Sequence, residues 1–164
     1  MRAEDYQAIA KWFDARPAAK RALRLTAKGA VVLVYLLYAG LLAVLAVLHD
    51  ARLWRVVAVP ASVFVIGTLL RAAINRPRPY EALNYTPLFP KTTKGKSMPS
   101  RHAFCAAGIA VAAFYISPPL GLLSGVLAVC VAVSRVLSGV HYPSDVLAGL
   151  ALGAALAWGG FYWL

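Results

Sequence analysis

Four long uncharged runs constrain the fold of this chain more than any other feature of its sequence. They contain no Lys, Arg, Asp or Glu and comprise 21, 15, 33 and 19 residues, at positions 29–49, 56–70, 102–134 and 146–164. A bilayer core requires about 20 apolar residues per helix, with about 17 as the lower end, so runs of roughly this length are typical of membrane-spanning segments. The chain is therefore predicted to cross a membrane several times.

A group of helix-breaking residues divides the longest of these runs. Ser117, Pro118 and Pro119 predict a tight turn between two antiparallel helices, because a single helix of 33 residues would have to pass through them. The predicted fold class is therefore all-α, a multi-spanning bundle of about five transmembrane helices. The expected spans are Gly29–Leu48, Trp54–Leu70, His102–Ile116, Leu120–Leu137 and Val146–Trp163.

The first 28 residues differ from the rest of the chain in charge and periodicity. They contain seven Lys or Arg, three acidic residues, and spaced aromatic and aliphatic side chains between Tyr6 and Phe13. This pattern predicts an amphipathic helix that lies in the headgroup region and ends at Pro17. The long, mixed charged stretch is unlike a secretory signal. We thus expect an interfacial segment at residues 1–28 and a transmembrane domain at residues 29–164.

The charge distribution bears on partners and on orientation. The 17 Lys and Arg residues outnumber six acidic residues and give a formal net charge of +11, but they flank apolar spans, so no nucleic-acid partner is expected. With five spans, 15 of the 17 basic residues lie on one side of the bilayer and Arg52 and Arg55 on the other. The positive-inside rule then predicts a cytoplasmic N-terminus and a cytoplasmic-facing site. The expected location is a bacterial plasma membrane.

Three clusters of ionisable residues, far apart in the sequence, are expected on that same side. The first extends from Arg71 to Arg78, the second is Pro99-Ser100-Arg101-His102, and the third lies in the range Ser134–Asp145. Ionisable side chains near membrane depth are costly and are usually functional. The topology therefore predicts that the three clusters meet at one cytoplasmic-facing site.

The first chemical expectation is a cage for a tetrahedral oxyanion, most naturally phosphate, formed by Arg71, Arg78 and Arg135. Guanidinium groups keep their charge and offer forked donors that match phosphate oxygens. Ser100 and the backbone N–H groups at the start of the third span add helix N-terminal donors to the same anion. Cations in this position stabilise the charge on the phosphoryl oxygens during transfer.

The second expectation concerns the histidines. His141 and Asp145 are four residues apart and flank Pro143, which suits the first turn of a helix. The carboxylate then fixes the imidazole tautomer and leaves the other ring nitrogen free to attack phosphorus. His102 is available to protonate the departing alkoxide. The spacing thus predicts covalent phosphoryl transfer.

Each of these residues also has a simpler interpretation. Arginines at helix ends usually extend to lipid headgroups, and Arg76 is treated as secondary because it breaks the seven-residue spacing of the first cluster. Asp145 alone could favour the helix dipole, and the basic run Lys91–Lys96 is expected to attract anionic lipid. The joint occurrence of the clusters, in order and on one face, favours a site.

The three clusters resemble the tripartite signature of the type 2 phosphatidic acid phosphatase superfamily, written KxxxxxxRP, PSGH and SRxxxxxHxxxD. The range Ser134–Asp145 matches the third motif completely, whereas Arg71 replaces the Lys of the first and Arg101 replaces the Gly of the second. The resemblance covers residues 71–145, nearly half of the chain. Three ordered motifs with the correct spacing make it specific.

The resemblance implies an enzyme that requires neither a metal nor another cofactor. His141 would form a phosphohistidine, Asp145 would orient it, and His102 would act as the general acid. The implied phosphate ligands are Arg71, Arg78, Ser100 and Arg135. At Arg101 two expectations remain open: contact with a second phosphate or an anionic headgroup, or a position facing headgroups or paired with Glu81.

The expected function is hydrolysis of a phosphomonoester or diphosphate on a membrane lipid, such as phosphatidate, phosphatidylglycerophosphate or a polyprenyl diphosphate. One alternative is a lipid phosphotransferase that uses the same intermediate, and another is a non-catalytic anion channel or anionic-lipid-binding protein. Vanadium haloperoxidases share the signature but are soluble and larger, so the spans argue against that chemistry. The expected partners are the bilayer and a phospholipid or polyprenyl phosphate substrate; the sequence carries no signal for oligomeric state.

Overall fold

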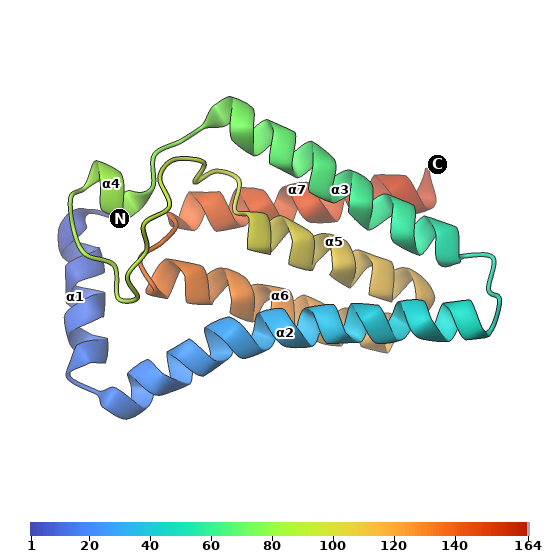
Figure 1. Cartoon of the computed structure of the whole chain (residues 1–164), viewed down its shortest axis with the longest axis horizontal. Helices are drawn as coiled ribbons and strands as arrows, with labels where there is room; N and C mark the ends of the chain where they lie inside the picture. Colours follow the sequence, from blue (N-terminus) through green and yellow to red (C-terminus); the bar gives the residue numbers. More distant parts are fainter. Residues whose placement is uncertain (164) are drawn as a thin grey trace.

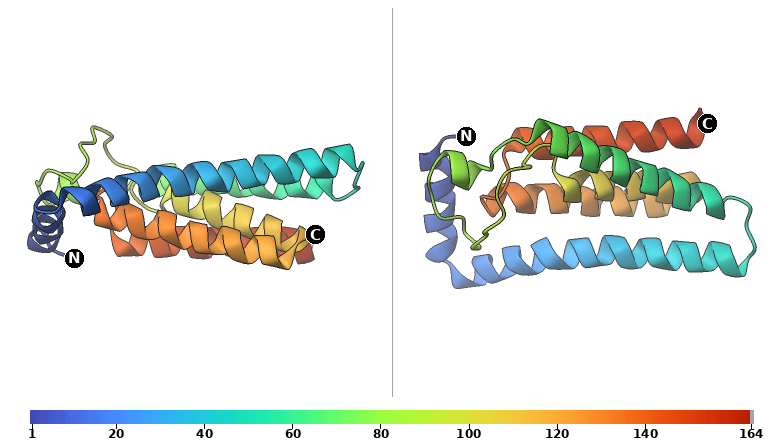
Figure 2. Two further views of the ribbon diagram at one scale, coloured as in Figure 1. Left: turned by 90° about the horizontal axis from the view of Figure 1, so that it is seen from below. Right: turned by 45° about the horizontal axis from the view of Figure 1, so that its top comes forward.

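The computed structural model describes residues 1–163, and this part of the chain forms helices joined by loops. The long helices run side by side, and α1 lies across one end of the bundle (Figure 1). Two further views show the same arrangement, with α1 seen end-on in one of them (Figure 2). The helices are α1 (Ala3–Asp14), α2 (Pro17–Val47), α3 (Leu53–Ile74), α4 (Pro79–Ala82), α5 (Arg101–Ile116), α6 (Pro118–Leu137) and α7 (Pro143–Tyr162).

The all-helical bundle predicted from the sequence is confirmed, and its third span is the short helix that the sequence predicted. Among the described residues, four helical segments, beginning at Pro17, Leu53, Pro118 and Pro143, are long and apolar enough to cross a membrane. The third expected span, α5, has 16 residues and is shorter than these. At 1.5 Å per residue it extends over about 24 Å, because Ser117 and Pro118 end it early.

The N-terminal segment divides at a different residue from the one expected. As predicted, α1 ends before Pro17, and this proline then occupies the first turn of α2, where its missing N–H costs nothing. However, α2 continues from Pro17 to Val47 without a break, so the expected boundary after residue 28 has no counterpart in the backbone. Residues 17–28 are thus the first turns of the long helix α2.

Helix α5 occupies the centre of the bundle, in contact with α2, α3, α6 and α7. Small side chains allow this close packing, and nine of its 16 residues are buried, most of them alanine. Gly153 on α7 also brings the two helices together: a Cβ atom there would lie 2.2 Å from the carbonyl oxygen of Phe104. This packing holds the N-terminal ends of α5 and α7 next to each other.

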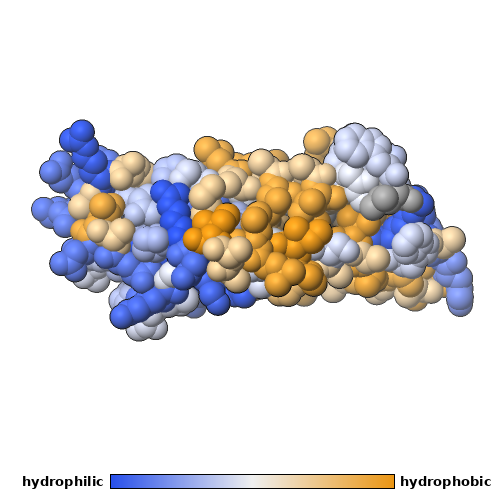
Figure 3. Space-filling model, turned by 90° about the horizontal axis from the view of Figure 1, so that it is seen from above, coloured by the Kyte–Doolittle hydropathy of each residue, from blue (hydrophilic) through white to orange (hydrophobic). Residues whose placement is uncertain are grey.

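The outer surface of the bundle is apolar. Large side chains such as Leu36, Val47 and Leu122 are more than 60% exposed, and Figure 3 shows an apolar band between two hydrophilic ends. Trp54 and Trp163 are exposed at the end opposite α1, where indole rings suit a membrane interface. The fold therefore leaves a lipid-facing belt and gathers α1, the loop of residues 75–100 and the link of residues 138–142 at one end (Figure 1).

Candidate active site

A cavity of about 200 Å³ lies at the end of the bundle where these loops meet. Of the ten described residues that line it, six are Lys or Arg, two are His, and none is acidic. The lining residues are Arg71, Arg78, Lys91, Thr93, Lys96, Arg101, His102, Arg135, Val140 and His141. The convergence expected from the three sequence clusters is therefore present, and the cavity suits a multiply charged anion.

Backbone carbonyls hold the arginines of the first cluster in place. The Nη1 atom of Arg71 donates to the carbonyl oxygen of Pro99 at 3.1 Å, and Nε of Arg78 donates to that of Gly95 at 3.1 Å. Within residues 1–163, none of the cavity cations forms an ion pair with a carboxylate. The charges of Arg71 and Arg78 are thus held in position, and the cavity cations are left for a bound anion to neutralise.

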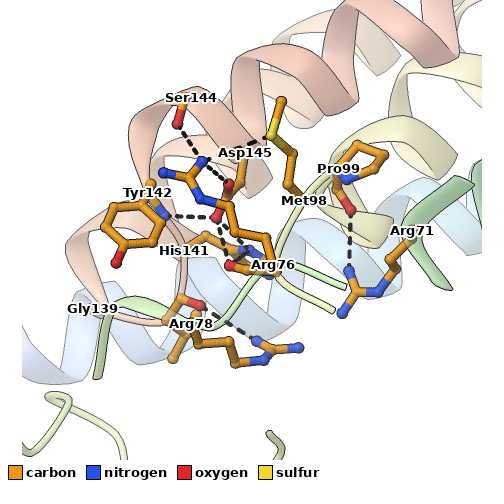
Figure 4. Close-up of polar contacts among 12 residues, drawn as sticks. Arg71, Arg76, Arg78, Met98, Pro99, Gly139, His141, Tyr142, Ser144 and Asp145 are labelled. Atoms are coloured by element: carbon orange, nitrogen blue, oxygen red, sulfur yellow. Dashed lines mark hydrogen bonds and ion pairs between the residues drawn. The ribbon is translucent and has the colours of Figure 1, made fainter. Parts of the chain in front are cut away.

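His141 and Asp145 form the pair that the spacing predicted. The imidazole Nδ1 lies 3.5 Å from Oδ2 of Asp145, and the two side chains are 4% and 0% exposed (Figure 4). Because Nδ1 faces the carboxylate and His141 lines the cavity, Nε2 is the nitrogen available to a bound anion. Pro143 begins α7 and places Asp145 in its first turn, so that the carboxylate also accepts a hydrogen bond from the N–H of Tyr142 at 3.0 Å.

Burial governs the protonation of His141. Desolvation lowers the pKa of this imidazole, and the nearby Arg78 and Arg71 lower it further, whereas the hydrogen bond and the charge of Asp145 raise it. The net direction is downward, so the imidazole is neutral at neutral pH. Its contact with Asp145 is then that of a neutral ring beside a carboxylate, and Nε2 retains its lone pair.

Ser97 is a site residue that the sequence did not reveal. Its hydroxyl donates to Oδ2 of Asp145 at 2.5 Å, and its Oγ lies 3.3 Å from Nδ1 of His141, so the serine bridges the two groups. Ser97 is fully buried. Ser97 lies 44 residues before His141 in a loop without periodicity. The only sequence feature that could have pointed to it as a site residue is its position two residues before Pro99.

Arg76, which we treated as secondary, contacts the same carboxylate. Its Nη1 lies 2.8 Å from Oδ1 of Asp145 and donates to Oγ of Ser144 at 2.9 Å. Its guanidinium lies over the ring of Tyr142, 4.2 Å from the ring centroid (Figure 4). Arg76 is not among the residues that line the cavity. It therefore compensates the buried charge of Asp145 and does not face the anion directly.

The residues of the second cluster do not all line the cavity. Arg101 and His102 line the cavity from the first turn of α5, but Ser100 does not. The N–H of Ser100 donates to the carbonyl oxygen of Asp145 at 2.9 Å, and its buried hydroxyl has no hydrogen-bond partner among the described residues. The backbone N–H of Ser100 thus joins α5 to α7, because the two helices pack closely there. The role of Ser100 as a phosphate ligand stays a prediction.

Two further cations come from the loop of residues 75–100. Lys91 and Lys96 line the cavity, whereas the sequence favoured lipid attraction for this basic run. Burial lowers the pKa of Lys91, and the nearby Arg135, Arg78 and Arg101 lower it further. The alternative pairing of Arg101 with Glu81 is absent from the described residues, and Oε2 of Glu81 instead accepts from the N–H groups of Arg78 and Gly95.

Helix α1 supports the link that carries His141. Tyr6 is buried, its hydroxyl donates to the carbonyl oxygen of His141 at 3.2 Å, and its ring stacks on Tyr85 with centroids 5.0 Å apart. Tyr85 in turn donates to the carbonyl oxygen of Gly139 at 2.7 Å. Two tyrosines from distant segments thus hold the backbone of the link on the side away from the cavity.

This combination of a cationic cavity, a buried His–Asp pair and a membrane-type bundle agrees with the comparison to known families. A model described as the PAP2 superfamily matches residues 52–164, well over half of the chain. The chain belongs to this superfamily. The resemblance noted from the three sequence motifs is thereby confirmed.

The relatives of this chain include proteins named as phosphatases. The chain is 37% identical over 122 residues to a decaprenylphosphoryl-5-phosphoribose phosphatase of Mycobacterium tuberculosis, covering 71% of this chain and 64% of the relative. It is 36% identical over 91 residues to an undecaprenyl-diphosphatase of Sulfolobus acidocaldarius, covering 55% of this chain and 44% of the relative. The chain thus spans less than two thirds of the length of these relatives.

A solved structure shares the fold. The crystal structure of a transmembrane PAP2 type phosphatidylglycerolphosphate phosphatase from Bacillus subtilis matches with a TM-score of 0.70 and 24% sequence identity. The match covers 96% of this chain and 83% of that one. Together with the apolar helices, this likeness establishes that the chain is an integral membrane protein with the fold of this superfamily.

Proposed function

We propose that this protein is a lipid phosphate phosphatase that hydrolyses a phosphomonoester or diphosphate at the membrane surface through a phosphohistidine. The observation that carries the proposal is the position of His141, which lies against Asp145 and lines a cavity that holds six cations. Supporting it, the relatives bear the names of lipid phosphatases. A buried neutral imidazole beside fixed cations suits attack on a phosphoryl group.

In the proposed first step, Arg71, Arg78 and Arg135 bind the phosphoryl oxygens, and Nε2 of His141 attacks phosphorus. The bond between phosphorus and the leaving oxygen breaks, and that oxygen receives a proton from His102. In the second step His102 removes a proton from water, which attacks phosphorus, and the bond to Nε2 breaks to release phosphate. Asp145, Ser97 and Arg76 hold the imidazole tautomer throughout.

Release of phosphate by the purified protein in detergent tests the proposal. We expect turnover of lipid phosphates that persists in excess chelator, and competitive inhibition by vanadate, which mimics five-coordinate phosphorus. A protein that only binds or conducts anions would release no phosphate. A phosphotransferase would instead transfer the group to an added alcohol in preference to water. Loss of activity in chelator would overturn the assignment of a metal-independent reaction.

The site is proposed to face the cytoplasm of a bacterial cell. The end of the bundle that carries the site also carries 15 of the 17 Lys and Arg residues, and the two chain termini lie at opposite ends (Figure 1). α1 is proposed to lie in the headgroup layer there. A reporter enzyme that is active only outside the cytoplasm should then be active when it is fused after residue 164. A cytoplasmic C-terminus would contradict this orientation.

Arg101 offers a direct test of how the cavity binds phosphate. Arg101 lines the same cavity as Arg71 and His141, so it is placed to bind the phosphoryl group that is transferred. We expect Arg101→Gly to lower kcat/KM by about tenfold on monophosphate and diphosphate lipids alike, since one charge-assisted contact is lost. Arg101→Lys should recover part of the loss. A loss confined to diphosphates would instead assign Arg101 to a second phosphate.

A further inference from the structure

A groove of about 570 Å³ opens beside the catalytic cavity, between the first turns of α2 and the loop of residues 75–100. Three residues, Lys91, Arg135 and Val140, line both the groove and the cavity. The two spaces are therefore adjacent. The wall that α2 contributes lies outside residues 52–164, the part of the chain that matches the superfamily model.

Charge and apolar surface are both present in this groove. Of its 11 described lining residues, Arg24, Lys28, Lys91 and Arg135 are cations and none is acidic. Val31, Val32 and Phe89 supply apolar surface. The guanidinium of Arg24 lies 4.9 Å from the ring centroid of Phe89, so α2 and the loop meet across the groove. A ligand that fits it has an anionic part next to an apolar chain.

Arg135 links the groove to the cavity. Its Nη2 atom donates to the carbonyl oxygen of Ala27 on α2 at 3.2 Å, while its buried Nε has no hydrogen-bond partner among the described residues. One guanidinium thus touches α2 and lines both spaces. Lys91 also lines both, so two cations can contact anionic groups on either side of the opening.

We propose that the groove binds the leaving group of the substrate and that this leaving group carries a phosphate of its own, so that the preferred substrate is a lipid diphosphate. This inference rests on the proposed phosphatase function. The terminal phosphate occupies the cavity, the inner phosphate lies against Arg24 and Lys28, and the apolar chain follows Val32 toward the bilayer. Lys91 and Arg135 contact both phosphates, which a single bridging oxygen joins.

The chemistry explains why these cations would matter for rate as well as for binding. When Nε2 of His141 attacks the terminal phosphorus, the bond from that phosphorus to the bridging oxygen breaks, and the electron pair leaves with the inner phosphate. Negative charge therefore increases next to Arg24 and Lys28 in the transition state. From a monophosphate lipid the leaving group is an alcohol, whose oxygen receives its proton from His102, so no charged phosphate is left in the groove.

Matched substrates and matched variants test this inference. Farnesyl diphosphate and farnesyl monophosphate differ only in the inner phosphate, so kcat/KM is measured on both. The double variant Arg24→Gln with Lys28→Gln removes the groove cations. The control, Lys20→Gln with Arg21→Gln, removes two charges from the same helix at positions that do not line the groove. Phosphatidylglycerophosphate and phosphatidate form a second pair, which distinguishes a diphosphate from a more distant phosphodiester.

We expect the groove variant to lose about tenfold or more in kcat/KM on farnesyl diphosphate and less than about twofold on the monophosphate, with the control close to wild type on both. Equal losses on the two farnesyl substrates, or equal effects of groove and control variants, would overturn the inference. So would a loss on phosphatidylglycerophosphate larger than that on farnesyl diphosphate, because the groove would then serve a phosphodiester.

Binding of inorganic pyrophosphate and inorganic phosphate, measured by titration calorimetry in detergent, separates this inference from the proposed function. We expect pyrophosphate to bind the wild type more tightly, and the groove variant to lose most of that preference. If the wild type turns over lipid phosphates but the groove variant keeps the same preference for pyrophosphate, the diphosphate assignment is wrong and the phosphatase function remains. Absence of both turnover and anion binding would overturn the two proposals together.

Discussion

Substitution of His141 by alanine is expected to abolish phosphate release, with a fall in kcat of at least about 10⁴-fold, as is typical when a covalent nucleophile is removed. His141 is 3% exposed, and its Nε2 is the nitrogen left available to the cavity once Nδ1 faces Asp145. No other described residue that lines the cavity places a ring nitrogen against a carboxylate. The measurement is single-turnover phosphate release, with acid-labile phosphoenzyme trapped by quenching.

His49→Ala is the matched control, because this histidine lies in the turn between α2 and α3 at the opposite end of the bundle. We expect it to retain wild-type activity. A His141→Ala protein that still forms phosphoenzyme would exclude His141 as the nucleophile. If His141→Ala instead loses vanadate and phosphate binding together with its thermal stability, the role of His141 is to stabilise the fold rather than to take part in the reaction.

The second large effect is expected from Asp145→Asn. This change preserves shape but removes the acceptor that orients Nδ1, and comparable changes to orienting carboxylates lower kcat by about 10⁴-fold. Asp145 raises the pKa of His141 against the lowering caused by burial. Loss of the carboxylate should therefore lower the pKa further and move the acid limb of the activity profile to lower pH. Residual kcat/KM measured across pH tests both effects.

Asp50→Asn serves as the control, because Asp50 is paired with Arg52 at the far end of the bundle and should affect neither rate nor profile. Ser97→Ala should also lower kcat, but by a smaller factor than Asp145→Asn. Ser97 bridges His141 and Asp145, and the direct contact between these two side chains remains without it. An acid limb that moves to higher pH in Asp145→Asn would contradict the electrostatic role of Asp145.

Arg76 and the tyrosines show why sequence patterns miss part of such a site. Arg76 compensates Asp145 across 69 residues of sequence, and Tyr6 reaches the carbonyl of His141 across 135. Both contacts are made by loop residues or by a helix outside the matched region, and neither position has a periodicity or fixed spacing that points to its partner. Sequence patterns therefore predicted the candidate catalytic groups better than the residues that hold them in place.

The order and spacing of residues alone specified an all-helical membrane protein whose three ionisable clusters face one side. Run length, together with the break at Ser117 and Pro118, predicts the number of bilayer crossings, and an odd or even number of crossings decides which loops share a side. The pair His141 and Asp145 was also accessible, since Pro143 begins a helix and places Asp145 in its first turn, close to the residue two positions before that helix.

Only tertiary packing decided the rest. The small residues of α5 bring its first turn against α7, so the N–H of Ser100 joins the two helices. Lys91 and Lys96 from the loop line the cavity. Likewise, the unbroken α2 places Arg24 and Lys28 beside the cavity. Contacts of this kind depend on how closely helices approach, a distance set by side-chain volumes on several elements at once.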